Sequence, residues 1–107
     1  MEFNYIIVMI TAPNQESAKE IASALVEQKL AACVNIITPV HSIYRWEGHI
    51  NDEPEVLLLV KTRAEIFEAK VVPAVIEVHP YDVPEIIALP ILMGSSRYLD
   101  WIAAETI

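Results

Sequence analysis

The chain has 107 residues, enough for one domain with a hydrophobic core and too few for two, so we expect a single domain over residues 1–107. Fifteen acidic residues against seven basic ones give a net charge of −8, which repels phosphate backbones and anionic membranes and argues against nucleic-acid or membrane binding. Cys33 is the only cysteine, which excludes an intramolecular disulfide, and its apolar strand predicts a buried small hydrophobe in a reducing compartment.

The first two elements are predicted to be a strand and a helix. Residues 3–11 form the strand, and its unbroken apolar run from Tyr5 to Ile10 calls for burial of both strand faces. Residues 15–31 place apolar side chains at helical spacing and charged ones away from them, which predicts an amphipathic helix. Glu2 stands where a signal peptide carries basic residues, and the apolar run is too short to span a membrane, so we expect a cytoplasmic protein.

Residues 31–62 are predicted to form one long β-hairpin. Small or polar residues alternate with apolar or aromatic ones, and Glu47-Gly48 supplies a two-residue turn because glycine tolerates positive φ. Pro39 lacks a donor for the strand ladder and predicts a bulge or bend. The hairpin is long for a chain of this size, so part of it is expected to project beyond its own sheet.

The second half of the chain is predicted to contain a helix, a loop, a strand and a last helix. Thr62 followed by Glu65 predicts a capping box for a helix over residues 63–78, which Pro73 is expected to kink or break. Residues 79–84 contain two prolines and predict a stiff loop. The remaining expected elements are a strand over Glu85–Leu89, a turn and N-cap at Gly94-Ser95-Ser96, and a helix with an apolar face of Tyr98, Leu99, Trp101 and Ile102.

This order predicts an α+β fold, the ferredoxin-like βαββαβ arrangement with an added C-terminal helix. Both crossover helices then lie on one face of an antiparallel sheet. The strands are apolar on both faces, so we expect the other face to pack against copies of the same chain.

No catalytic motif is present, neither a glycine-rich phosphate loop nor a G-x-S-x-G, H-E-x-x-H or C-x-x-C sequence, so we expect no enzyme. The three histidines, His41, His49 and His79, are isolated in sequence, and for each an ordinary surface or loop histidine is favoured over a metal ligand. His79 is the best candidate metal ligand, because it lies on a rigid turn beside Tyr81, Asp82 and Glu85. Four residues make an acidic patch near the hairpin tip, for which a solvated turn is favoured over a hard-cation site: Glu47, Asp52, Glu53 and Glu55.

Three other side chains have two open interpretations. Tyr44 and Trp46 could stack on a ligand, although anchoring a subunit interface is favoured. Lys61 could pair with a carboxylate or an anion, or be an ordinary lysine at the end of a strand.

The segments AACVNIITPVHSIYRWEGHI, EVLLLVKT and VHPYDVPEIIALPI, followed by YLDWI and preceded by TAP at 11–13, resemble the CutA family of divalent-cation tolerance proteins. The resemblance implies a homotrimer of ferredoxin-like subunits with strands pairing across subunits. It also implies a role in the response to copper and other divalent cations, with copper ion binding by some members. Some bacterial members carry a cysteine and a second histidine where this chain has Ile10 and Val78, so of these positions only His79 matches.

The resemblance further implies an inter-subunit cleft, placed like the ligand clefts of the trimeric PII signal-transduction proteins. Its residues here are Trp46, Glu55, Lys61, His79, Tyr81 and Glu85. Two functions remain open. The first is a non-enzymatic homotrimer that binds copper or another divalent cation weakly and needs none for folding. The alternative is a PII-like signalling or protein-interaction module that binds a small ligand in its clefts.

Overall fold

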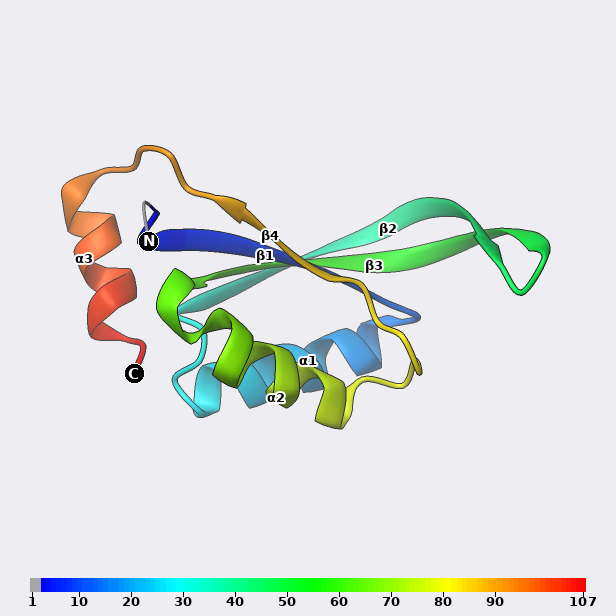
Figure 1. Cartoon of the computed structure of the whole chain (residues 1–107), viewed down its shortest axis with the longest axis horizontal. Coiled ribbons are helices and arrows are strands. Elements are labelled where there is room, and N and C mark those ends of the chain that lie inside the picture. The colour runs from blue at the N-terminus through cyan, green and yellow to red at the C-terminus, as the bar shows by residue number, and fades with distance from the viewer. Residues whose placement is uncertain (1–2) are drawn as a thin grey trace.

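The computed structural model describes residues 3–107, in which four strands form one antiparallel sheet of order β2-β3-β1-β4. The elements are β1 (Tyr5–Ala12), α1 (Gln15–Glu27), β2 (Cys33–Trp46), β3 (His49–Arg63), η1 (Ala64–Ile66), η2 (Phe67–Val71), α2 (Val72–Val78), β4 (Ile86–Pro90) and α3 (Ser96–Ala104). Figure 1 shows α1 and α2 together on one face of the sheet and α3 beyond one end. The predicted ferredoxin-like α+β fold with an added C-terminal helix is confirmed.

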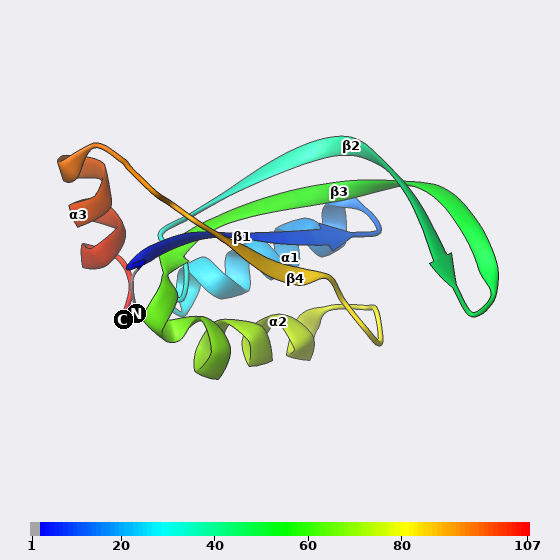
Figure 2. The same cartoon turned by 45° about the horizontal axis from the view of Figure 1, so that its top comes forward.

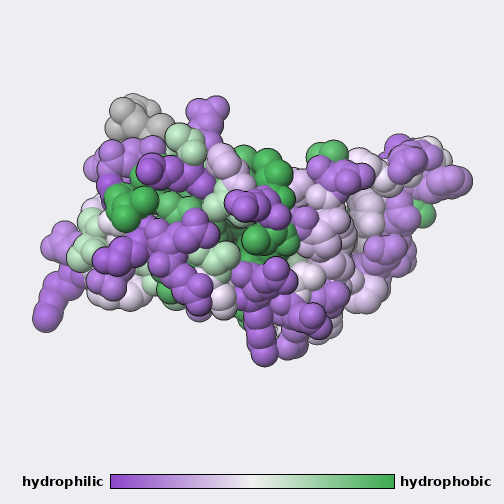
Figure 3. All heavy atoms as spheres, turned by 90° about the horizontal axis from the view of Figure 1, so that it is seen from below, coloured by the Kyte–Doolittle hydropathy of each residue, from purple (hydrophilic) through white to green (hydrophobic). Residues whose placement is uncertain are grey.

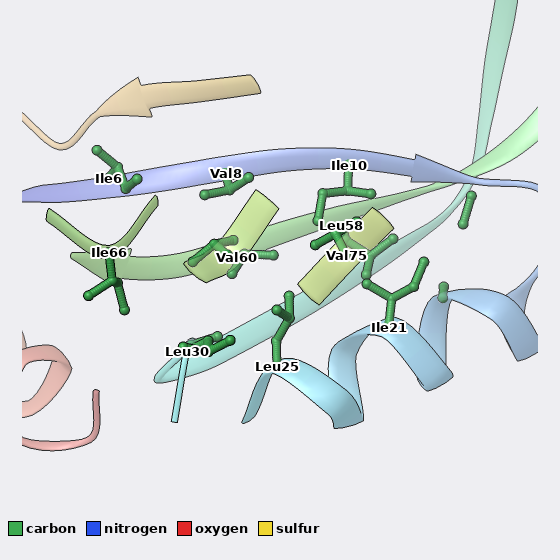
Figure 4. Close-up of a cluster of buried hydrophobic side chains, with 14 of the residues drawn as sticks. Ile6, Val8, Ile10, Ile21, Leu25, Leu30, Leu58, Val60, Ile66 and Val75 are labelled. Atoms are coloured by element: carbon green, nitrogen blue, oxygen red, sulfur yellow. The ribbon is translucent and has the colours of Figure 1, made fainter. Parts of the chain in front are cut away.

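The core lies between the sheet and the two crossover helices. Even-numbered residues of β1 point toward the helices, and Val8 and Ile10 are fully buried there. Leu58 of β3, Ile21 of α1 and Val75 of α2 are also fully buried and meet them in the same layer (Figure 4). Burial of each such side chain contributes roughly 1.5–3 kcal/mol, so this layer fixes the helices on the sheet. The outer surface of the helix layer is mostly hydrophilic (Figure 3).

The opposite face of the sheet is only partly covered. Ladder pairing places Ile7 beside Leu89 and Met9 beside Ile87, with all four side chains on the side away from the helices. Ile87 and Leu89 are each 51% exposed. We call this surface the open sheet face; its apolar residues on β1, β3 and β4 are Ile7, Met9, Leu57, Leu59, Ile87 and Leu89, and Ile37 of β2 lies beside Leu57 on the same side. The expectation that both faces of the first strand are buried is therefore not met within one chain.

The hairpin of β2 and β3 is built as the sequence predicts. Its turn is Glu47-Gly48, with φ of 50° and 80°. The ladder shifts register between Ile37 and Val40, so that Thr38 and Pro39 oppose a single residue of β3, which confirms the bulge at Pro39. Figures 1 and 2 show the hairpin extending past the other two strands and curving toward the helix side of the molecule.

The start of the second helix differs from the prediction. Thr62 does not cap it: this residue still belongs to β3, is fully buried, and donates its hydroxyl hydrogen bond to the Leu30 carbonyl at 2.7 Å. Glu65 pairs with Arg63 instead of reaching back to a capping position. The helix begins at Ala64 with a 3₁₀ turn and a π-helical segment, and regular α-helix starts only at Val72.

Pro73 lies in the first turn of α2. The π-helical segment η2 directly precedes it, and the Val72 N–H donates to the Phe67 carbonyl, so the proline sits where the helix changes from π to α geometry. The predicted disruption is thus real, but it takes the form of irregular helix before the proline and not of a kink in a continuous helix.

The other predicted boundaries hold with small shifts. The N-cap of α1 is Asn14, whose side chain accepts from the Ser17 N–H at 2.8 Å, and the helix ends at Glu27, before the predicted residue 31, because Lys29 adopts a positive φ of 59°. Ser95 caps α3 as predicted. Cys33 is half-buried on the sheet side that faces away from α1 and α2, which corrects the prediction that it is buried. Among residues 3–107 no helix combines the length and apolarity needed to cross a bilayer.

Candidate ligand groove

A groove of about 790 Å³ lies where the hairpin leaves the sheet. One wall is the outer part of β2 and β3, and the other is the loop between α2 and β4. Figure 2 shows this loop and the curved hairpin at the same end of the molecule. The side chains that give the groove its chemistry are three aromatic rings, Tyr44, Trp46 and Tyr81, and three carboxylates, Glu55, Asp82 and Glu85.

Glu55 and Tyr81 join the two walls. Glu55 is only 7% exposed, and the Tyr81 hydroxyl donates a hydrogen bond of 2.7 Å to its Oε2. Such a short bond to an ionised acceptor is roughly twice as strong as a neutral one. Burial, followed by the hydrogen bond to Glu55 and its negative charge, raises the pKa of Tyr81 well above its ordinary value of 10.0. The pair therefore holds the loop against the base of the hairpin with the phenol protonated.

Tyr44 makes a similar hydrogen bond to a glutamate nearer the hairpin tip. Its hydroxyl donates to Glu53 Oε2 at 3.2 Å, and desolvation and the Glu53 carboxylate raise the pKa of Tyr44. Trp46 is 47% exposed and donates its indole N–H to Glu47 at 2.8 Å. Both rings thus present apolar surface to the groove while their polar atoms are already satisfied.

The side chain of His79 connects the loop between α2 and β4 to β1. It is 8% exposed, its Nδ1 accepts from the Tyr81 backbone N–H at 3.1 Å, and its Nε2 lies 2.8 Å from the Thr11 carbonyl oxygen. A carbonyl can only accept, so Nε2 carries the proton and the imidazole is the neutral tautomer. Its ring also packs on that of Tyr81, with centroids 4.9 Å apart. Both ring nitrogens are engaged, so a metal ion at His79 must displace one of these hydrogen bonds.

One chain brings together four of the five residues predicted beside His79 in the cleft: Trp46, Glu55, Tyr81 and Glu85. Lys61 is elsewhere. It lies six residues along β3 from Glu55, about 20 Å at the usual rise per residue, and donates to the side chain of Asn35. The cleft is predicted between subunits, so the place of Lys61 in it stays a prediction about the assembly.

The other metal candidates are dispersed. His41 pairs with Asp52 on the exposed surface of the hairpin, and His49 is exposed beside the turn. Within residues 3–107 no three His, Cys, Asp or Glu side chains are placed to hold one metal ion. Three members of the acidic patch are exposed, in agreement with a solvated turn, whereas Glu55 is buried and belongs to the groove.

His41 and Asp82 also line the groove, although the sequence did not place them in it. For His41 a signal existed: the Glu47-Gly48 turn fixes the hairpin register and sets His41 diagonally across from Asp52.

Comparison with known proteins gives a consistent result. The family model described as CutA1 divalent ion tolerance protein matches residues 6–105. The divalent-cation tolerance protein CutA of Thermus thermophilus is 52% identical over 100 residues, which cover 94% of this chain and 96% of that protein. A solved structure of the divalent cation tolerance protein of Thermus thermophilus superposes with a TM-score of 0.92 at 50% identity, over 96% of this chain and 99% of that one.

The solved structure of the periplasmic divalent cation tolerance protein CutA of Archaeoglobus fulgidus superposes with a TM-score of 0.90 at 46% identity, over 94% of this chain and 97% of that one. That location is stated for the Archaeoglobus protein, and the cytoplasmic location expected for the present chain stays a prediction. The chain spans only 54 to 64% of the length of plant and animal relatives that it also matches.

Proposed function

Because the chain belongs to the CutA1 divalent ion tolerance family, we propose that it acts as a non-enzymatic homotrimer that binds copper or another divalent cation weakly. Family membership is the observation that carries the link to divalent cations. The open sheet face supports assembly, since six apolar side chains on one sheet surface are normally covered by a partner.

The sheet edges support the same assembly. In the order β2-β3-β1-β4 the outer strands are β2 and β4, and each leaves one edge without a partner in the described chain. β2 is 14 residues long, and a long unpaired edge is a template for pairing with another chain. The number of three subunits rests on the family resemblance.

Weak cation binding agrees with the dispersed ligands. Within residues 3–107, the imidazole and carboxylate groups of one chain occur singly or in pairs, such as His41 with Asp52. A site with so few ligands binds a metal ion with low affinity. At His79, binding also requires the ring to release the Thr11 carbonyl or the Tyr81 N–H. We therefore expect an affinity well below that of a closed metal site.

Calorimetric titration with Cu²⁺ and with Zn²⁺ tests this proposal. The samples are wild type, His79→Gln, and the control His49→Gln at an exposed position. We expect at least tenfold weaker Cu²⁺ binding in His79→Gln and no change in the control. Equal Cu²⁺ binding by all three proteins, with circular dichroism showing that the fold is intact, would show that His79 is not a ligand.

A second function is favoured by the groove itself, namely a PII-like signalling or interaction module that binds a small ligand. Its volume of about 790 Å³ falls within the usual range for small-molecule sites, roughly 300–1,000 Å³. Trp46 in the groove is a natural fluorescent reporter. Replacing Trp101, the other tryptophan, by Phe makes Trp46 the sole indole, and saturable quenching by an organic compound favours this function.

A further inference from the structure

The groove is acidic and aromatic at once. The residues that line it in one chain, taken from residues 3–107, include three carboxylates and three aromatic rings and no Lys or Arg. The whole chain carries a net charge of −8, so nothing in its overall charge offsets this local potential. The residues that one chain contributes to the groove therefore favour a neutral or positively charged ligand.

Glu55 gives the groove a directed polar group. More than nine-tenths of this residue is buried, yet only Oε2 accepts a hydrogen bond, from Tyr81. Within the described chain every fully buried side-chain oxygen or nitrogen has a partner. Oε1 of Glu55 has none, so it must reach the open space of the groove that this residue lines. A buried carboxylate with one unpaired oxygen is a strong site for a cationic donor.

The shape of the site suits an organic cation better than a metal ion. The carboxylates of the described residues do not converge in a group of three that could hold one ion. They frame a larger volume, and the rings of Trp46, Tyr44 and Tyr81 line the same space. Aromatic faces attract ammonium and guanidinium groups within about 6 Å of the ring centroid and also pack on their carbon chains.

We propose that the groove binds an organic cation bearing an ammonium or guanidinium group, which donates to Glu55 Oε1 and packs against Trp46. Desolvation raises the pKa of both Tyr44 and Tyr81, followed by the hydrogen bonds to Glu53 and Glu55 and by the negative charges of these two carboxylates. This inference rests on the second function above, ligand binding in the groove, and names the class of ligand. The carboxylates that this chain contributes to the groove disfavour nucleotides and other polyanions.

The test is a fluorescence titration of the assembled protein in the Trp101→Phe background. The probes are agmatine, which carries a guanidinium and an ammonium group, ATP as an anion, and glycerol as a neutral compound. We expect saturable quenching of Trp46 by agmatine alone. Glu55→Gln keeps an acceptor for Tyr81 and removes the charge, and it should weaken agmatine binding at least tenfold.

Two further variants keep the result decisive. Asp82→Asn, on the exposed rim, should weaken agmatine binding by about two- to fivefold even if Glu55→Gln fails to fold. Glu20→Gln, exposed on α1, should change nothing. Saturable binding of ATP or glycerol without agmatine overturns the inference and leaves the second function standing. No response of Trp46 to agmatine overturns the inference, and unchanged agmatine affinity in both groove variants overturns the role of the carboxylates.

Discussion

Replacing Tyr81 by Phe removes one hydroxyl from the contact that joins the loop to the hairpin. The ring, its packing on His79 and the backbone hydrogen bonds of the loop are kept. What is lost is the 2.7 Å donor to Glu55, a carboxylate that is only 7% exposed. The change in the free energy of unfolding therefore measures how much one charge-assisted hydrogen bond in the groove contributes to stability.

The magnitude follows from the burial of the acceptor. A hydrogen bond to a charged group contributes about 1.5–3 kcal/mol. Water that enters from the open groove can replace part of the lost bond at Oε2, so we expect about 1.5 kcal/mol of destabilisation, close to a tenfold change in the unfolding equilibrium. Tyr44→Phe is the matched control, because its bond to Glu53 is longer, at 3.2 Å, and exposed; it should cost less than about 0.5 kcal/mol.

Guanidinium unfolding followed by circular dichroism measures both variants, with the subunit concentration held constant because unfolding of an oligomer depends on it. A double-mutant cycle with Glu55→Gln should show coupling between Tyr81 and Glu55. If Tyr81→Phe and Tyr44→Phe lower the free energy of unfolding equally, or if the cycle shows no coupling, the Tyr81–Glu55 hydrogen bond does not stabilise the groove as described.

Three more predictions use the same unfolding assay. Because the pKa of Tyr81 is raised above 10.0 in the folded chain, its contribution is complete below pH 10 and is lost above it, so Tyr81→Phe should lose less stability than wild type on alkaline titration; equal slopes contradict this. Leu58→Ala in the core should cost about 2–5 kcal/mol, while Leu92→Ala, at a 73% exposed position, should stay within about 0.5 kcal/mol. Thr62→Val should cost about 1–3 kcal/mol by leaving the Leu30 carbonyl unpaired, and a neutral result would contradict this role of the hydroxyl.

Most of the fold could be predicted because its signals are local. The Glu47-Gly48 turn, the bulge at Pro39 and the Ser95 cap each depend on a few neighbouring residues whose backbone preferences decide the outcome. The apolar strands predicted an uncovered sheet face, and the open sheet face is found where the crossover helices leave it.

The predicted capping box was wrong because the Thr62 side chain can instead hydrogen-bond to a group that is distant in sequence. Thr62 lies in register with the buried positions of β3, and the Leu30 carbonyl, 32 residues earlier in the chain, takes its hydroxyl. Nothing within a few residues of Thr62 distinguishes the two outcomes. The helix accordingly begins without a side-chain cap.

The candidate site was predictable only in part, and the family resemblance supplied most of it. Glu55 looks like one more acid of the hairpin, and its burial comes from Tyr81, which lies 26 residues later. His79 stands out in the sequence for its place on a rigid turn, but its two backbone hydrogen bonds depend on the packing of the loop against β1. Long-range contacts of this kind leave no pattern in the local sequence.

Whether copies of the chain cover the open sheet face can be measured by light scattering coupled to size-exclusion chromatography. At micromolar concentration we expect one species with three times the 12.0 kDa mass of the chain. A well-folded monomer of 12.0 kDa under the same conditions would contradict this assembly, because it would show that the apolar face is stable in water without a partner.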